Sequence, residues 1–259
     1  MKNPGQRLAV SALILLAMAV AGFGQSTDRP QNEIEVFATF SIPGGDTSFS
    51  TTGSTGTVID FSRDFDFQSE WGFELRYTRR SKNGKHKLVA DYADTRWNRD
   101  TVLTRSFTFL GETYLANLAA SGDLKLQYGR GMYAYRWGND KVRIGPMVDM
   151  GVIKTSLELT GTTNSGTRTR EGSITKFAAT VGYDLDYDPH PKVNIFNNLG
   201  AIAFQGDHLF HVEGGVRVYV SKQFGVTGGY KAQRYKLVDG DNFFRVRSHG
   251  PFFGGIFRF

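Results

Sequence analysis

Hydrophobic and polar residues alternate along most of the chain. In EIEVFATFSI, which begins at residue 33, every second side chain is apolar, starting with Ile34. The segments EWGFELRYTRR, KFAATVGYDLDYD and LFHVEGGVRVYV repeat this period of two. Such alternation over eight or more residues is typical of β-strands with two chemically different faces. The pattern therefore predicts an all-β protein.

Ten strands are expected in total, and an even number would bring both chain ends to the same side. Their ranges are 33–42, 69–79, 86–97, 124–137, 141–158, 173–188, 192–204, 208–221, 223–237 and 243–259. Eight strands, with one weak hairpin outside the sheet, are the alternative. The segment LKLQYGRGMYAYRW changes parity around Gly129-Arg130-Gly131. A bulge there would turn Arg130 and Arg136 to one face and the neighbouring aromatics to the other.

The connections differ systematically in length. Tight turn signals at 81–84, 138–140, 189–191 and 221–223 alternate with other connections, at 43–66, 98–123, 160–172, 205–207 and 238–242. Within the second of these, SFTFLGETYLA can form a β-hairpin. Short turns at one end and larger loops at the other are typical of an antiparallel up-and-down barrel in the bacterial outer membrane.

The N-terminus has the pattern of a secretory signal. MKNPGQR is basic, LAVSALILLAMAV is apolar but too short to span a bilayer comfortably, and small residues follow. We expect a signal peptide over 1–24 and a barrel domain over 25–259, with cleavage after Ala21 or Gly24. An uncleaved anchor helix is the alternative.

Alternation alone does not distinguish a membrane barrel from a soluble sandwich. The two folds differ in whether the charged face is turned toward the interior or toward the solvent outside. In a membrane barrel the apolar face meets lipid and the polar face lines the lumen. The expected strands run about 10–17 residues, against about 5–6 in soluble sheets, and aromatics such as Trp71, Tyr187 and Phe224 stand near their ends. We therefore predict a lumen lined by charged residues. Those we assign to it are Glu35, Glu74, Arg76, Asp91, Arg143, Asp149, Asp184, Glu213, Arg217 and Lys231.

The chain ends in GPFFGGIFRF, with Gly254, Phe257 and the terminal Phe259 in a Gly-x-x-aromatic-x-aromatic arrangement. This ending resembles the C-terminal assembly signal of bacterial outer-membrane β-barrel proteins, although Phe252 stands where that family usually has a polar residue. The resemblance implies location in the cell outer membrane of a Gram-negative bacterium. It also implies contact with membrane lipid and lipopolysaccharide, and assembly by the barrel-assembly machinery with periplasmic chaperones. We expect a monomer, with Phe253, Phe257 and Phe259 facing lipid and Arg258 facing the lumen or its periplasmic rim.

Composition removes several classes of function. The 259-residue sequence has no cysteine, which excludes thiolate metal sites and cysteine nucleophiles. The net charge of +6 comes from interspersed basic and acidic residues, so no nucleic-acid partner is expected. We find no metal-ligand spacing and no phosphate-binding loop, and we expect no cofactor. The charged lumen can form either an ion-pair network that plugs the barrel or a narrow, porin-like passage for small solutes.

Two further functions stay open. Omptin proteases, which are ten-stranded, use acidic residues and an Asp-x-His pair near the outer rim; here Asp91 and Asp94 lie on one strand and Asp207-His208 are adjacent. Ser248-His249 offers a His–Ser pair like that of outer-membrane lipid-A hydrolases. Neither arrangement matches well, and a non-enzymatic barrel is our prediction. The alternative is adhesion or ligand binding through the outer loops. These loops carry Arg105, Arg168 and Arg170 and can equally be solvated and mobile.

Overall fold

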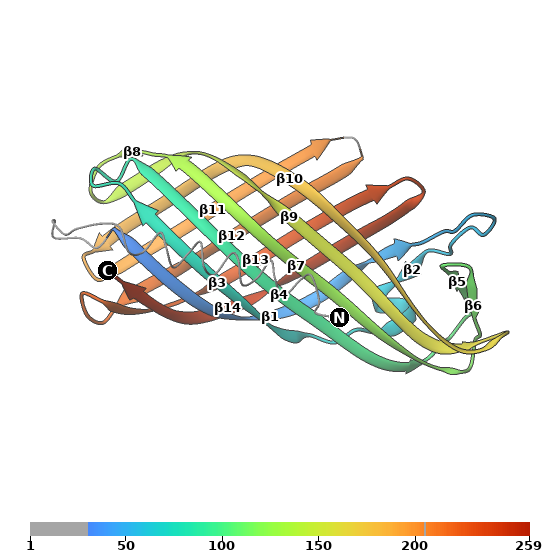
Figure 1. The fold of residues 1–259 in the computed structure, drawn as a ribbon. Coiled ribbons are helices and arrows are strands. Elements are labelled where there is room, and N and C mark those ends of the chain that lie inside the picture. The colour runs from blue at the N-terminus through green and yellow to red at the C-terminus, as the bar shows by residue number, and fades with distance from the viewer. Residues whose placement is uncertain (1–30, 205) are drawn as a thin grey trace, which may run out of the picture.

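The computed structural model describes residues 31–204 and 206–259, so the expected signal peptide lies outside the described residues. Ten long antiparallel strands form one closed ring (Figure 1). In chain order they are β1 (Asn32–Ser48), β3 (Glu70–Arg80), β4 (His86–Val102), β7 (Ala119–Tyr135), β9 (Val142–Thr163), β10 (Gly166–His190), β11 (Val193–Phe204), β12 (Asp207–Tyr219), β13 (Phe224–Asp239) and β14 (Asn242–Arg258). The short elements are β2 (Ile59–Asp60), the helical turn η1 (Phe61–Phe65), β5 (Phe107–Phe109), β6 (Glu112–Tyr114) and β8 (Trp137–Gly138).

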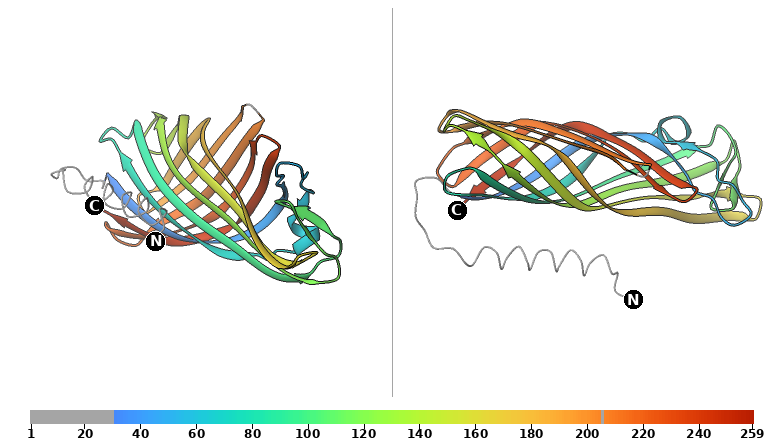
Figure 2. Two further views of the ribbon diagram at one scale, coloured as in Figure 1. Left: turned by 45° about the vertical axis from the view of Figure 1, so that its right-hand side comes forward. Right: turned by 90° about the horizontal axis from the view of Figure 1, so that it is seen from above.

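The ring closes between the first and last strands. Ile34 on β1 lies opposite Phe257 on β14 and opposite Tyr77 on β3, and each neighbouring pair in the ring is antiparallel. The views in Figure 2 show the strands slanting around the barrel. The predicted ten-stranded up-and-down barrel is confirmed, and the eight-stranded alternative is wrong.

The two ends of the barrel differ. Both described chain ends lie at one end, where the Asn32 amide donates to the Phe259 carbonyl at 3.3 Å and the Phe259 amide returns the bond at 3.0 Å. The tight turns after β3, β8, β10 and β12 share this end, which we call the turn end. The opposite, loop end carries the connection between β1 and β3 and the β5–β6 hairpin (Figure 1). This hairpin, with Phe107 opposite Tyr114, confirms the one expected within SFTFLGETYLA.

The expected loop at 160–172 is not a loop, and that prediction was wrong. β9 and β10 continue through it with one-to-one pairing up to Thr163 opposite Gly166. The segment is rich in threonine, whose branched side chain suits an extended backbone. Gly166 takes the positive φ of 97° at the tip of the hairpin. The result is a long projection at the loop end, in which β7 also pairs with β9 as far as Ala120 opposite Gly161.

The expected bulge at Gly129-Arg130-Gly131 is also absent. β7 pairs one-to-one with β4 and with β9 through these residues. Leu124 and Tyr128 are buried on the same face that turns Arg130 and Arg136 inward. The apparent parity change therefore comes from a change in the chemistry of the interior, not from an irregular backbone.

The interior has two chemically different zones. One is an apolar cluster that includes Phe61, Trp97 and Leu237 and is built largely from loop-end residues. The other, toward the turn end, holds charged side chains on the inward positions. On the outside, apolar side chains such as Met150, Phe177 and Val226 are exposed. No helix within the described ranges is long and apolar enough to cross a membrane.

One stretch of wall is paired on a single side. β10 pairs with β9 from Gly166 to Tyr187, but its pairing with β11 starts only at Val181 opposite Ala201. Among the described residues, the stretch from Gly166 to Thr180 therefore has no strand partner on its β11 side.

Candidate functional site

The centre of the lumen is occupied by Arg76, which projects from β3. Its guanidinium donates to both carboxylate oxygens of Glu213 on β12, at 2.6 and 2.7 Å, and to Glu74 at 2.7 Å. Strands β13, β14 and β1 separate β3 from β12 in the ring, so this contact bridges the interior. A bidentate guanidinium–carboxylate pair is among the strongest polar contacts in proteins.

A second bridge ties β13 to the opposite wall. The ammonium of Lys231 donates to Glu74 and, at 2.9 Å, to the Tyr128 hydroxyl. That hydroxyl in turn donates to Glu74 at 3.0 Å. Three strands thus share one carboxylate inside the barrel.

The network continues to either side of Arg76. Asp91 accepts from Arg130 at 2.6 Å, and Arg130 also lies 3.8 Å from Asp149. The same oxygen, Oδ2 of Asp149, lies 3.4 Å from Nε2 of His211, and neither of these two atoms makes a hydrogen bond within the part of the chain that the structure describes. Each charge is therefore close to an opposite or polar partner, as a buried charge requires.

Toward the turn end a further layer centres on Arg217 of β12. Its guanidinium contacts Glu35 on β1 and donates to the Asn194 amide oxygen at 2.9 Å. Asp184 on β10 accepts from Lys87 at 2.7 Å, and Asp186 accepts from Arg136. These contacts link β1, β4, β10, β11 and β12, together with Arg136, which directly follows β7.

Aromatic rings fill the spaces between these charges. Phe37, Phe196 and Phe252 form a small buried cluster inside the lumen. The guanidinium of Arg217 lies 3.8 Å from the ring centre of Phe196, and that of Arg76 lies 4.8 Å from Phe37. Such stacking fixes the arginine side chains while leaving their N–H groups free for the carboxylates.

The structure places all ten of the charged residues assigned to the lumen on inward positions. Nine are buried, and Arg143 lies at the turn-end rim, 3.2 Å from the exposed Asp140. Sequence reasoning left Glu33 and Lys87 out of the set. Each is the second residue of its strand, where too few alternating residues precede it to show which face of the strand it occupies. The available signal was the spacing of two residues between Glu33 and Glu35 and between Lys87 and Val89, which places each pair on one face of its strand.

The loop end is closed by a packed cap formed by residues 49–67 and the β5–β6 hairpin. Phe61 and Phe65 of η1 are fully buried against strand residues such as Phe244. Asp60 begins η1 by accepting from the amides of Ser62 and Arg63, at 3.0 and 2.8 Å. The predicted loops are therefore ordered here.

One ion pair fixes the cap segment to the connection between β4 and β5. The Asp64 carboxylate accepts from Arg105 at 2.9 and 2.7 Å, and from the Asp60 amide at 2.8 Å. Burial alone would raise the pKa of Asp64, but the hydrogen bonds from Arg105, Arg63 and the Asp60 amide outweigh burial and lower it below its ordinary value. Arg105, expected as a free loop cation, is thus a structural contact.

The residues considered for hydrolysis are not brought together. Ser248 points inward to the Ser41 hydroxyl, whereas His249 lies on the exposed face and its Nδ1 is 2.6 Å from the Tyr230 hydroxyl. Asp91 is held by Arg130 in the lumen, and Asp207 accepts from the Val238 amide at 2.7 Å. No three histidine, aspartate or glutamate side chains in the described ranges gather as a metal site would require.

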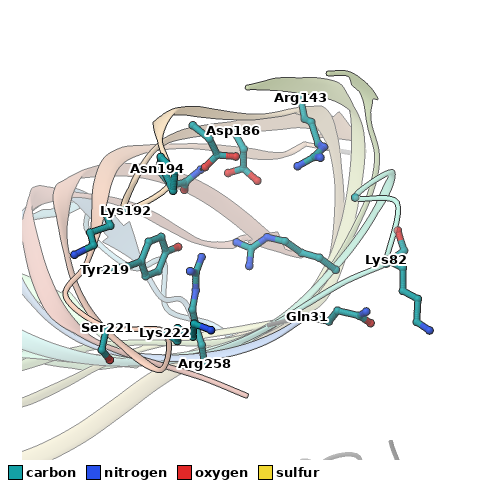
Figure 3. A pocket seen from close by; sticks show the side chains of 15 residues that line it. Gln31, Lys82, Arg143, Asp186, Lys192, Asn194, Tyr219, Ser221, Lys222 and Arg258 are labelled. Atoms are coloured by element: carbon teal, nitrogen blue, oxygen red, sulfur yellow. The ribbon is translucent and has the colours of Figure 1, made fainter. Parts of the chain in front are cut away.

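A cavity of about 480 Å³ opens at the turn end. Figure 3 shows Arg143 and Arg258 pointing into it, with Asp186, Asn194 and Tyr219 around it, while Lys82 points away. The guanidinium of Arg258 lies 3.1 Å from the ring centre of Tyr219. We call this cavity the vestibule.

Comparison with solved structures identifies the fold. The chain is similar to the outer membrane protease OmpT from Escherichia coli, with a TM-score of 0.57 and 10% identity over 91% of this chain and 99% of that one. The fold is that of an outer-membrane β-barrel. At this identity the likeness establishes the architecture alone, and it transfers no activity.

Weaker likenesses concern other barrels. The translocator domain of the autotransporter NalP from Neisseria meningitidis gives a TM-score of 0.47 at 10% identity, covering 98% of this chain and 96% of that one. Ail, the attachment invasion locus protein of Yersinia pestis, gives 0.36 at 14%, covering 88% and 99%. No protein-family model matches the sequence, and no curated protein matches it.

Proposed function

We propose that the protein is a non-enzymatic, closed outer-membrane barrel that anchors its packed cap at the cell surface. The observation that carries this proposal is the Arg76–Glu213 bridge across the lumen together with the ring of contacts around it. Side chains from facing walls meet at hydrogen-bond distance, and a ten-stranded barrel has little room beyond its own side chains. A passage for solutes would require these pairs to separate, and leaving one charge buried without its partner costs several kcal/mol.

Planar-bilayer recording tests the proposal. The purified, folded protein is expected to give no resolved single-channel current. The double variant Arg76→Ala/Glu213→Ala removes both partners together and leaves no unpaired charge from this pair. Because the Arg217 layer and the packed cap still close the lumen, this variant is also expected to give no resolved current. A resolved current from the unaltered protein would establish a channel and refute the closed barrel.

A second candidate is binding at the cell surface through the cap. Val58 in the cap is 45% exposed, and Val102 and Leu118, on either side of the second long connection, are 59% and 38% exposed. Exposed apolar side chains of this kind suit contact with a partner. If the cap is adhesive, Val102→Ser/Leu118→Ser is expected to reduce attachment of protein-bearing cells to host cells or matrix. Unchanged attachment, with the cap still folded, would count against it. Deleting residues 105–120 is a less specific test because Phe107, Phe109 and Tyr114 are buried there.

A further inference from the structure

The vestibule at the turn end is strongly basic. Its lining includes Arg80, Lys82, Arg143, Lys192, Lys222 and Arg258, whereas Asp186 and Asp188 are its acidic residues. Its volume of about 480 Å³ lies within the roughly 300–1,000 Å³ typical of small-molecule sites. Basic groups at the mouth of a concave site attract anions from solution.

The acidic groups in and beneath this cavity are already engaged. Glu33 is shared by three guanidinium groups, those of Arg258 at 3.1 Å, Arg80 at 3.5 Å and Arg217 at 3.6 Å. Asp186 contacts Arg136 and lies 3.6 Å from Lys87. Asp188 accepts from Asn194 at 2.9 Å. The carboxylates near the vestibule therefore do not balance its cations one for one.

Arg143 has the weakest protein partner of the three arginines that line the cavity. Its recorded ion pair is with Asp140, which is 92% exposed, and such a pair contributes little. Arg258, by contrast, is held over Tyr219, and Arg80 is held by Glu33. Arg143 and Arg258 point into the same space (Figure 3), so two guanidinium groups from different strands face one cavity.

The inner side of the vestibule is the Arg217 layer of the lumen, in which Arg217, Glu35 and Asp186 are buried. A ligand that enters from the turn end thus meets packed side chains, not an open lumen. This geometry favours retention at the mouth over conduction through the barrel.

We propose that the vestibule binds a small multivalent anion, with at least two phosphate or carboxylate groups, from the turn-end side of the membrane. Arg143 and Arg258 hold one anionic group each through paired N–H donors. Arg80 and the lysines of the tight turns, which are Lys82, Lys192 and Lys222, add to the positive electrostatic potential of the cavity. This site is separate from the cap and does not depend on whether the lumen conducts.

Isothermal titration calorimetry on the folded full-length barrel in a zwitterionic detergent tests the proposal. The probes are tripolyphosphate and citrate, with monovalent acetate for comparison. We expect measurable binding of a multivalent probe at low salt, weaker binding as salt rises, and no comparable binding of acetate. No binding of either multivalent probe at about 1 mM would overturn the proposal.

A matched pair of variants locates the site. Arg143→Gln is expected to weaken binding about tenfold, because it removes charge-assisted hydrogen bonds. Arg168→Gln makes the same change in net charge on the β9–β10 projection at the other end, and it is expected to leave binding unchanged. Equal loss in both variants would mean a non-specific charge effect and would refute a vestibule site.

The source of the anion is distinguished by membrane composition. Titrations are repeated in nanodiscs of phosphatidylcholine with and without cardiolipin, a lipid with two phosphate groups. A lipid headgroup as the occupant is indicated if cardiolipin competes with the probe and Arg143→Gln removes that competition. A soluble anion is indicated if the probe binds equally in both membranes. Either result, with the Arg143 dependence, supports the vestibule as an anion site.

Discussion

Arg76 on β3 and Glu213 on β12 meet across the lumen, with both carboxylate oxygens of Glu213 within 2.7 Å of guanidinium nitrogens. The same guanidinium also lies 3.7 Å from Glu35 and 3.8 Å from Asp91. One cation therefore offsets the mutual repulsion of several buried carboxylates.

Arg76→Met is expected to destabilise the folded barrel by about 3–5 kcal/mol, because it leaves Glu213 buried without its bidentate partner and leaves Lys231 as the remaining cation beside Glu74. Urea unfolding in detergent micelles, followed by heat-dependent gel mobility, measures the change. Arg168→Ala, at an exposed position, is the control and should lie within about 0.5 kcal/mol of the unaltered protein. Adding Glu213→Gln to Arg76→Met should recover part of the loss. Equal stability of Arg76→Met and the control would contradict the central role of Arg76.

Gly254 gives a second prediction, because a Cβ at that position would lie 2.0 Å from the Val36 carbonyl oxygen. Gly254→Ala and Gly254→Arg are expected to impair closure of β1 on β14, and therefore outer-membrane insertion. Gly255→Ala is a matched control, since nothing lies within 4 Å of a Cβ there. The heat-modifiable fraction in outer membranes is the measurement. Normal insertion of the Gly254 variants would contradict the prediction.

Loss of Phe259 tests the assembly signal separately from the fold. The Phe259 ring stacks on Phe257 at 5.7 Å, and its backbone pairs with Asn32 at the seam. We expect a chain ending at Arg258 to insert poorly in cells but to refold in detergent with only a modest loss of stability. Insertion at the normal level in cells would show that Phe259 is not read as a signal.

Acid is expected to loosen the cap before the barrel unfolds. Because the folded-state pKa of Asp64 is lowered, its ion pair with Arg105 contributes stability that is fully present above the unfolded-state pKa of about 3.9. This contribution is lost as pH falls through the folded-state value. Hydrogen exchange of η1 amides between pH 5 and pH 2, corrected for intrinsic rates, is the measurement. Asp64→Asn should be loosened at every pH and should remove the pH dependence; an unchanged pH dependence in that variant would contradict the assignment.

Gly229 tests the packing of aromatic rings inside the lumen. A Cβ there would lie 2.7 Å from the Phe252 ring and 2.3 Å from the Gly214 carbonyl oxygen. Gly229→Val is therefore expected to destabilise the barrel by about 1–3 kcal/mol through overpacking. The same unfolding measurement checks it, with Phe252→Leu in the Gly229→Val background as a partial rescue. A stability equal to that of the unaltered protein would show that the wall relaxes around the added side chain.

The ten-stranded barrel could be predicted because alternation of apolar and polar residues is a local property of each strand. The inward assignment of Arg76, Glu213 and Arg217 followed from the same period. Which carboxylate each cation meets could not be predicted, because the partners come from strands far apart in sequence. The vestibule was missed for this reason, since Arg80, Arg143 and Arg258 lie in three separate segments.

The errors at Gly129–Gly131 and at 160–172 share one cause. We assumed a single chemistry for each face of a strand, apolar outward and polar inward. Leu124 and Leu126 face an apolar interior near the loop end, whereas Arg130 and Arg136 face a charged one. Beyond the lipid-facing band the outward face can be polar, so Thr160 and Thr167 continue strands that were mistaken for a loop.

The one-sided pairing of β10 between Gly166 and Thr180 has a consequence for crowded membranes. An extended backbone whose N–H and C=O groups lack a neighbour can recruit a strand from another molecule. This stretch carries Arg168, Arg170 and Lys176, whose like charges would be brought together if two copies joined edge to edge. Replacing these cations with threonine is therefore expected to promote association between copies of the protein through this edge.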